Sequence, residues 1–175
     1  MKKKKILLNK KETDLVLYKF LDSILKSRIN FSDVLIVGIK SGGVPFAALV
    51  RNAILERFNI GCDMGYVDMT LYRDDPLTVK KTVDATELPF DINGKEIILV
   101  DDVINSGRTV RASIDEIFDF GRPERIRLAV FIDKGGRELP ICPDFTGKKI
   151  RVGKDETIHV NVLNEEIFVE KITEK

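Results

Sequence analysis

A run of aliphatic residues that ends in two aspartates constrains the fold of this chain most. Residues 97–100 are Ile-Ile-Leu-Val, which predicts a buried strand that delivers Asp101 and Asp102 to its end. A turn of small residues follows and opens a helix, and Gly107 permits the positive φ that a tight turn needs. Because amides converge at a helix N-terminus, residues 105–109 suit a phosphate group.

Strands and amphipathic helices alternate along the chain, which predicts an α/β domain with a parallel sheet covered on both faces. In such sheets, ligands gather outside the carboxyl ends of the strands. The stretch 72–93 carries charges and two prolines and is expected to be a long, mobile excursion. The expected strands are 34–38, 64–71, 96–100 and 126–132, with β-like alternation in 158–172, and the expected helices are 11–26, 45–58 and a third that ends at Gly121.

Length and composition fit one globular domain of 175 residues, 43% apolar and 33% charged. No apolar run approaches the roughly 18 residues of a membrane span. The basic start is followed by too short an apolar stretch for a secretory signal, so a cytoplasmic protein is expected. The net charge of +1 argues neither for nor against nucleic acid. Cys62 and Cys142 are too few for a disulfide framework and are predicted to be buried or incidental thiols.

The segment 97–109 resembles the motif with which type I phosphoribosyltransferases bind 5-phosphoribosyl-1-pyrophosphate (PRPP). Further stretches, covering most of the chain, resemble the PyrR family. These stretches are Leu71–Asp75, Gly121–Pro123, Arg137–Pro140 and Asp144–Lys148. The resemblance implies one phosphoribosyltransferase domain, 1–175, with a central mostly parallel sheet flanked by helices, a flexible loop at about 72–93, and a small hood at about 133–157 plus the terminal segments. It also implies two activities: a uracil phosphoribosyltransferase, and an RNA-binding attenuator of pyrimidine biosynthesis genes.

The family's reaction assigns roles to residues at these positions. Uracil displaces pyrophosphate from PRPP to give UMP, and Asp101 and Asp102 would hold the ribose diol and, indirectly through water and PRPP, a Mg²⁺ ion. The resemblance makes Lys40, in a pyrophosphate loop, and Arg73, on the long excursion, the cations that meet the leaving group. It assigns PRPP binding to Val100, Asp101, Asp102, Val103, Ile104, Asn105, Ser106, Gly107, Arg108 and Thr109 in one loop and to Lys40, Ser41, Gly42 and Gly43 in the other.

Two positions bear on activity and base choice. Gly42 stands where the family usually has arginine. Because the loss of one charged hydrogen bond lowers affinity or rate by about ten- to a hundred-fold, activity is expected to be weaker but need not vanish. Asn105 stands where purine-using relatives tend to carry an acid, which favours a pyrimidine. Backbone groups near 131–137 are expected to read the base.

RNA attenuation needs basic groups on one face, and some family positions are altered. The candidate RNA contacts are Lys19, Arg137, Lys148 and Lys149. Asp22 and Gly136 replace histidines of the family pattern, and Cys142 and Pro143 interrupt a stretch that usually has arginine. In the family the basic face belongs to a dimer, so a homodimer or higher homo-oligomer that binds the pyr mRNA leader is expected.

Two alternatives stay open from the sequence. The chain could be a nucleotide-sensing RNA regulator with weak or no catalysis, which Gly42 favours and the altered basic positions oppose. It could also be a phosphoribosyltransferase for another base, such as a purine, which Asn105 opposes.

Overall fold

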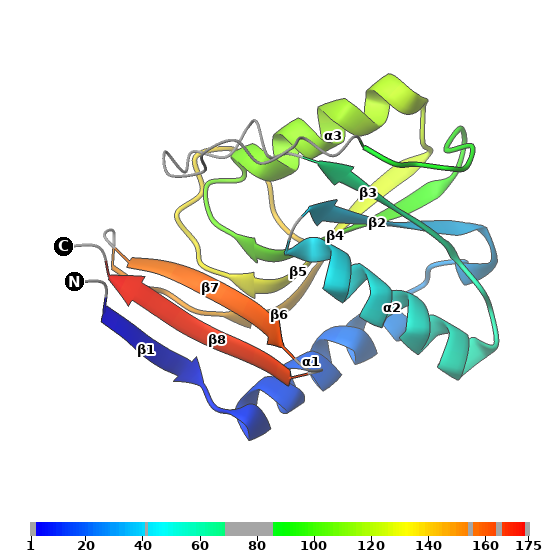
Figure 1. The fold of residues 1–175 in the computed structure, drawn as a ribbon. Helices are drawn as coiled ribbons and strands as arrows, with labels where there is room; N and C mark the ends of the chain where they lie inside the picture. Colours follow the sequence, from blue (N-terminus) through cyan, green and yellow to red (C-terminus); the bar gives the residue numbers. More distant parts are fainter. Residues whose placement is uncertain (1–2, 41, 69–85, 154–155, 164–165, 174–175) are drawn as a thin grey trace.

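A five-stranded parallel sheet forms the centre of the computed structural model, which describes residues 3–40, 42–68, 86–153, 156–163 and 166–173 (Figure 1). Its strands are β2 (Val34–Lys40), β3 (Asp63–Asp68), β4 (Glu96–Ile104), β5 (Arg125–Asp133) and β6 (Phe145–Lys149). The spatial order is β3-β2-β4-β5-β6, and all neighbours are parallel. The predicted α/β class is confirmed. Because the strand order reverses between β2 and β4, a ligand site is expected at their carboxyl ends.

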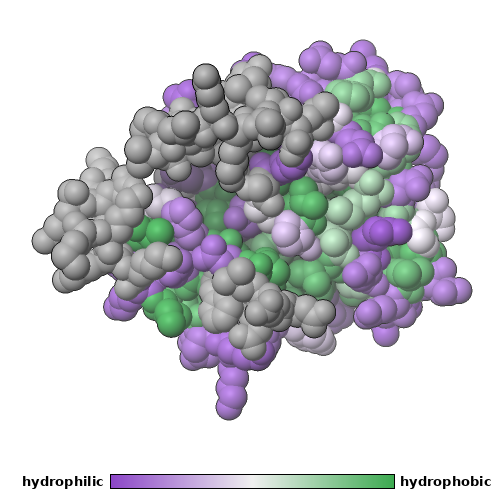
Figure 2. Space-filling model, viewed as in Figure 1, coloured by the Kyte–Doolittle hydropathy of each residue, from purple (hydrophilic) through white to green (hydrophobic). Residues whose placement is uncertain are grey.

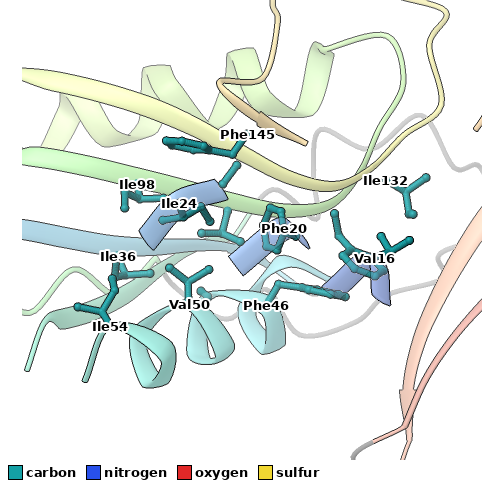
Figure 3. Close-up of a cluster of buried hydrophobic side chains, with 14 of the residues drawn as sticks. Val16, Phe20, Ile24, Ile36, Phe46, Val50, Ile54, Ile98, Ile132 and Phe145 are labelled. Carbon is teal, nitrogen blue, oxygen red and sulfur yellow. The ribbon is translucent and has the colours of Figure 1, made fainter. Parts of the chain in front are cut away.

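Helices cover both faces of this sheet (Figure 1). Helices α1 (Lys10–Leu25) and α2 (Gly43–Phe58) pack on one face, and α3 (Arg108–Phe120) packs on the other. Figure 3 shows how Phe20 of α1 and Phe46 of α2 meet between helices and sheet. The Phe46 ring stacks on Phe131 of β5 at 4.5 Å between centroids, so the two helices and the sheet share one core. No helix in the described residues is long and apolar enough to cross a membrane.

A second, smaller sheet forms the hood. Its strands β1 (Lys3–Leu8), β8 (Glu166–Thr173) and β7 (Glu156–Leu163) lie in that order, and both pairs are antiparallel. Leu8, Ile158 and Val169 join it to the core under α1. The sequence indicated a hood of about 133–157 plus the terminal segments. The structure puts the terminal segments there but gives β6 to the central sheet, because Phe145 is buried and β6 pairs with β5.

Two element boundaries differ from the predictions in ways that affect the site. Strand β4 runs four residues past the predicted end at Val100, because its pairing with β5 continues to Ile104. Of the predicted excursion 72–93, residues 72–85 lie outside the described part of the chain. Its remainder is anchored, since Leu88 and Ile92 are buried against the α3 face of the sheet and Glu87 exchanges two 2.9 Å backbone hydrogen bonds with Tyr66.

The two cysteines lie in different environments. Cys62 is buried, and its thiol donates to the carbonyl of Phe31 at 3.5 Å, whereas Cys142 is exposed. Burial raises the pKa of the Cys62 thiol, which keeps it protonated and unreactive near neutral pH. We expect Ellman's reagent to titrate one thiol per native chain and two after unfolding. A native Cys142→Ser variant that still reacted with one equivalent would contradict this assignment.

Candidate active site

A cavity of about 570 Å³ opens where the strand order reverses, between the carboxyl end of β4 and the hood strand β7. Its volume lies in the range typical of small-ligand sites, roughly 300 to 1,000 Å³. It is lined by Gly42, Pro45, Asp101, Asp102, Val103, Asn105, Thr109, Lys134 and residues 157–162. Many of the residues predicted to bind PRPP thus border one space.

The paired acids lie near the carboxyl end of β4 and point to different sides of it, because successive side chains of a strand point to opposite faces. Asp101 is 2% exposed and borders a second, small cavity beside the start of α3, while Asp102 is half-buried and lies against the start of α2. Each carboxylate accepts a 2.9 Å hydrogen bond from the next backbone amide. Both acids still line the large cavity, so they can meet one ligand from two sides.

Two glycines at the start of α2 allow its close approach to β4. A Cβ on Gly42 would lie 2.2 to 2.5 Å from the three carboxylate atoms of Asp102. A Cβ on Gly43 would lie 2.2 Å from the carbonyl oxygen of Val100. Any side chain at either position therefore requires a shift. The arginine of the family pattern does not fit at position 42 while Asp102 keeps this place.

The turn between β4 and α3 encloses the small cavity, of about 80 Å³. Gly107 has a φ of 92°, as the turn predicted from the sequence requires, and α3 begins at the next residue. The amide of Arg108 donates to the Ser106 hydroxyl oxygen at 3.3 Å. The cavity is lined by Asp101, Val103, Ile104, Asn105, Ser106, Gly107, Thr109 and Val110. The first turn of a helix directs amide donors toward such a space, which suits an anion.

The predicted cations take different positions. The ammonium of Lys40 lies 3.9 Å from the Asp68 carboxylate and 4.6 Å from the centre of the Tyr66 ring, so it faces the end of β3. Arg73 and Ser41 fall outside the described residues. The side chain of Arg108 points away from the cavity into an ion pair with Glu138 at 2.7 Å. Among the named PRPP residues, Val100 is fully buried in the core.

Sequence reasoning did not single out Lys134, Pro45 or the β7 wall. Burial lowers the pKa of Lys134, with Glu156 opposing the shift. The backbone amides of Lys134 and Gly135 donate to Ile104 and Asp133. Of the predicted base segment 131–137, Lys134 borders the cavity. Alternation in 158–172 indicated strands, but only the sheet order reveals that β7 faces the site.

The predicted RNA contacts differ in burial. Lys19 on α1 and Lys148 and Lys149 on β6 are exposed, and these elements touch, since a Cβ on Gly147 would lie 3.2 Å from Val16. Arg137 is 19% exposed, and its guanidinium forms an ion pair with Asp133, which is opposite Lys149 in the pairing of β5 with β6. Asp22 pairs with Lys26 at 2.8 Å, which raises the pKa of that lysine. Arg137 is therefore distinguished from the three lysines by its internal partners and not by its distance from them.

The acids suit a magnesium ion that is shared with a ligand. Carboxylate oxygens are the ligands Mg²⁺ prefers, and it usually keeps several waters and substrate oxygens as well. Within the described residues, no group of three or more His, Cys, Asp or Glu side chains could hold a metal by itself. Asp101 and Asp102, both open to the cavity, are thus the residues that fit such an ion.

Comparison with known proteins assigns the chain to a family. Residues 5–165 match the family model of the phosphoribosyl transferase domain. A bifunctional PyrR protein of Halalkalibacterium halodurans is 46% identical over 155 residues, which span 86% of this chain and 85% of that protein. A bifunctional PyrR protein of Thermus aquaticus is 40% identical over 164 residues, which span 93% and 91%. The hypoxanthine phosphoribosyltransferase of Trypanosoma cruzi shares the fold, with a TM-score of 0.66 and 19% identity over 94% of this chain and 95% of that one. With the acids and the amide turn at the strand-order reversal, these matches show that the chain belongs to the PyrR family of type I phosphoribosyltransferases.

Proposed function

We propose that this chain transfers the phosphoribosyl group from PRPP to uracil, giving UMP and pyrophosphate, in the cavity between β4 and β7. The observation that carries the proposal is the shared cavity. Two carboxylates border the large cavity at the carboxyl ends of β2 and β4, and Asp101, Asn105 and Thr109 line both this cavity and the small one inside the amide-lined turn. A ribose phosphate offers hydroxyls for the acids and a phosphate for the turn, so one ligand satisfies both groups.

The roles of the residues follow from the charge that the reaction moves. The bond from C1 of the ribose to pyrophosphate breaks, a bond from N1 of uracil to C1 forms, and the N1 proton passes to water or to an oxygen of the released pyrophosphate. Positive charge develops on the sugar ring, where Asp101 and Asp102 stabilise it while they hold the diol. The turn 105–109 anchors the 5′-phosphate, and Lys40 and Arg73 would meet the leaving group.

Magnesium completes the charge balance. When bound, Mg²⁺ would neutralise pyrophosphate oxygens and so make that group easier to displace. Asp101 and Asp102 would hold it through water and PRPP oxygens. The acids thereby orient the sugar without needing a closed metal cage.

The wall opposite the acids supplies the base site. Strand β7 is the edge of the hood sheet, and among the described residues no strand pairs with its outer side. An edge strand presents unpaired N–H and C=O groups, which complement the alternating carbonyl and N–H groups of uracil. Lys134 adds a donor in the same cavity and would bind a uracil carbonyl oxygen.

The direct test is pyrophosphate release from PRPP and Mg²⁺ with one base at a time. We expect release with uracil and little with hypoxanthine, guanine or cytosine. Pyrophosphate release with a purine and not with uracil would show that the substrate is a purine. No release with any base, while PRPP or UMP still binds, would favour the nucleotide-sensing regulator.

Lys134→Met is expected to raise the KM for uracil by roughly tenfold, because a charged hydrogen bond to the base contributes about 1.5 kcal/mol or more. The KM for PRPP should change little. Lys149→Met serves as the control, since Lys149 is exposed on β6 and outside the cavity. Equal KM values for uracil in the wild type and Lys134→Met would remove Lys134 from the base site.

A second function, binding of the pyr mRNA leader, is supported by Lys19, Lys148 and Lys149 on the adjoining α1 and β6. Filter binding at several salt concentrations, with and without UMP, tests it. Lys148→Gln should weaken binding and lower the salt slope by about one if Lys148 meets a phosphate. Binding that ignores both RNA sequence and UMP would eliminate attenuation.

The proposal includes a cytoplasmic homodimer or larger homo-oligomer. Figure 2 shows apolar side chains along α2 with hydrophilic ones around them, and Tyr18, Leu55 and Phe58 are 65%, 45% and 41% exposed. Tyr18 and Phe58 line the same groove between α1 and α2, and neighbouring exposed apolar side chains favour association. Light scattering of the purified protein gives the number of copies.

A further inference from the structure

The carbonyl groups of the phosphate turn are held from outside by a neighbouring segment, 134–139. The Ile104 carbonyl accepts from the Lys134 amide at 3.0 Å. The Ser106 carbonyl accepts from the amides of Glu138 and Leu139 at 2.9 and 3.2 Å. The carbonyl between them, of Asn105, accepts from the Arg137 side chain at 2.9 Å. Three successive carbonyls are therefore engaged by 134–139, which we call the brace.

This arrangement matters for an anion site. Carbonyl oxygens repel a phosphate, whereas amide N–H groups attract it. Bonds to the brace keep the carbonyls of 104–106 occupied and leave the first amides of α3 to face the 80 Å³ cavity. The brace thus fixes which groups of the turn a phosphate meets.

Arg137 supplies a side-chain bond to one of these three carbonyls, whereas the bonds to the other two come from backbone amides. Its guanidinium is part of a side chain only 19% exposed. Besides the Asn105 carbonyl, it donates to the Ile141 carbonyl at 2.9 Å and forms an ion pair with Asp133 at 2.9 Å. Three acceptors in different directions use the planar fork of arginine, and a lysine ammonium cannot reach them together.

The backbone of the brace is shaped for this contact. Gly135 and Gly136 have φ values of 77° and 72°, which turn the chain back toward β4 at little cost for glycine. The Gly135 amide donates to the same Asp133 oxygen that pairs with Arg137. A Cβ on Gly136 would lie 2.8 Å from the side-chain oxygen of Asn105, so the turn and the brace are in direct contact.

We propose that Arg137 is a positioning residue for PRPP, which presets the phosphate turn by holding the Asn105 carbonyl, and is not an RNA contact. This inference rests on the proposed PRPP site. The 5′-phosphate lies away from the reacting carbon and is bound alike before and during the reaction. Loosening the turn therefore weakens binding of PRPP more than it slows the chemical step.

The test is Arg137→Lys, which keeps the charge and loses the fork. The KM for PRPP should rise about tenfold, as expected for one charged hydrogen bond, while kcat and the KM for uracil change little. Arg127→Lys is the matched control. Arg127 is 24% exposed and bonds Glu96 and Asp144 near the start of β5, at the opposite end of the strand from the site. Its KM for PRPP should equal that of the wild type.

Asp133→Asn provides a second variant, because it removes the ion pair of Arg137 while keeping an acceptor. It should raise the KM for PRPP in the same direction. Calorimetric titration measures the affinity for PRPP without turnover. If the wild type binds PRPP but releases no pyrophosphate, the proposed reaction is wrong, and the role of Arg137 in PRPP binding can still be tested. A folded Arg137→Lys protein with unchanged PRPP affinity overturns the inference. If Arg137→Lys loses leader RNA binding while its PRPP affinity is unchanged, Arg137 is an RNA contact.

Discussion

Asp102→Asn is expected to lower kcat/KM for PRPP about 100-fold, because in the proposed site it removes a charge that would face both the sugar and the leaving group. The change keeps the size of the side chain and its acceptor for the Val103 amide, so β4 should keep its end. Steady-state pyrophosphate release at several Mg²⁺ concentrations measures the loss. Thermal unfolding should occur within a few degrees of the wild type.

Asp119→Asn is the control for this prediction, since Asp119 is an exposed acid on α3 outside the large cavity. It should leave kcat/KM unchanged. Equal activity of Asp102→Asn and the wild type would remove Asp102 from the site, and the diol assignment would then depend on Asp101 alone.

Restoring the family's arginine with Gly42→Arg is expected to lower activity, although sequence comparison suggests the opposite. A Cβ at position 42 would lie 2.2 Å from an Asp102 oxygen, so the carboxylate must turn away. Displacing the carboxylate should lower kcat/KM by about ten- to a hundred-fold, which is at most the loss expected from neutralising it. Gly42→Ala isolates the effect of the Cβ and should reproduce most of this loss.

Gly61→Ala is the matched control, because a Cβ there meets nothing within 4 Å. It should be as active as the wild type. If Gly42→Arg exceeds the wild type while Gly42→Ala falls below it, the arginine finds a different loop conformation and the missing cation limits the natural enzyme.

The sequence predicted the part of the site that is local along the chain. Four aliphatic residues, two acids and a glycine turn lie within one strand-turn-helix unit, so their geometry follows from backbone preferences. The positive φ of Gly107 and the start of α3 agree with that prediction. The order of β2 and β4 in the sheet then places the unit beside Gly42.

The rest of the site depends on contacts between distant segments, which periodicity does not encode. No strand was predicted for the lysines at 3–5, yet their backbone pairs with 171–173 in the hood. Arg137 was predicted to contact RNA, but one of its acceptors is the carbonyl of Asn105, in a turn about thirty residues earlier. Lys134 is a site residue because it lines the same cavity as β7, a contact between segments that are distant in the sequence.

The pairing of β1 with β8 sets an order on folding. These strands come from opposite ends of the described chain, so bringing them together carries a large loop-closure entropy until the intervening domain has formed. We therefore expect the hood to dock last, onto a central sheet that already presents its phosphate turn. An intermediate of this kind would recognise a ribose phosphate before it could discriminate among bases.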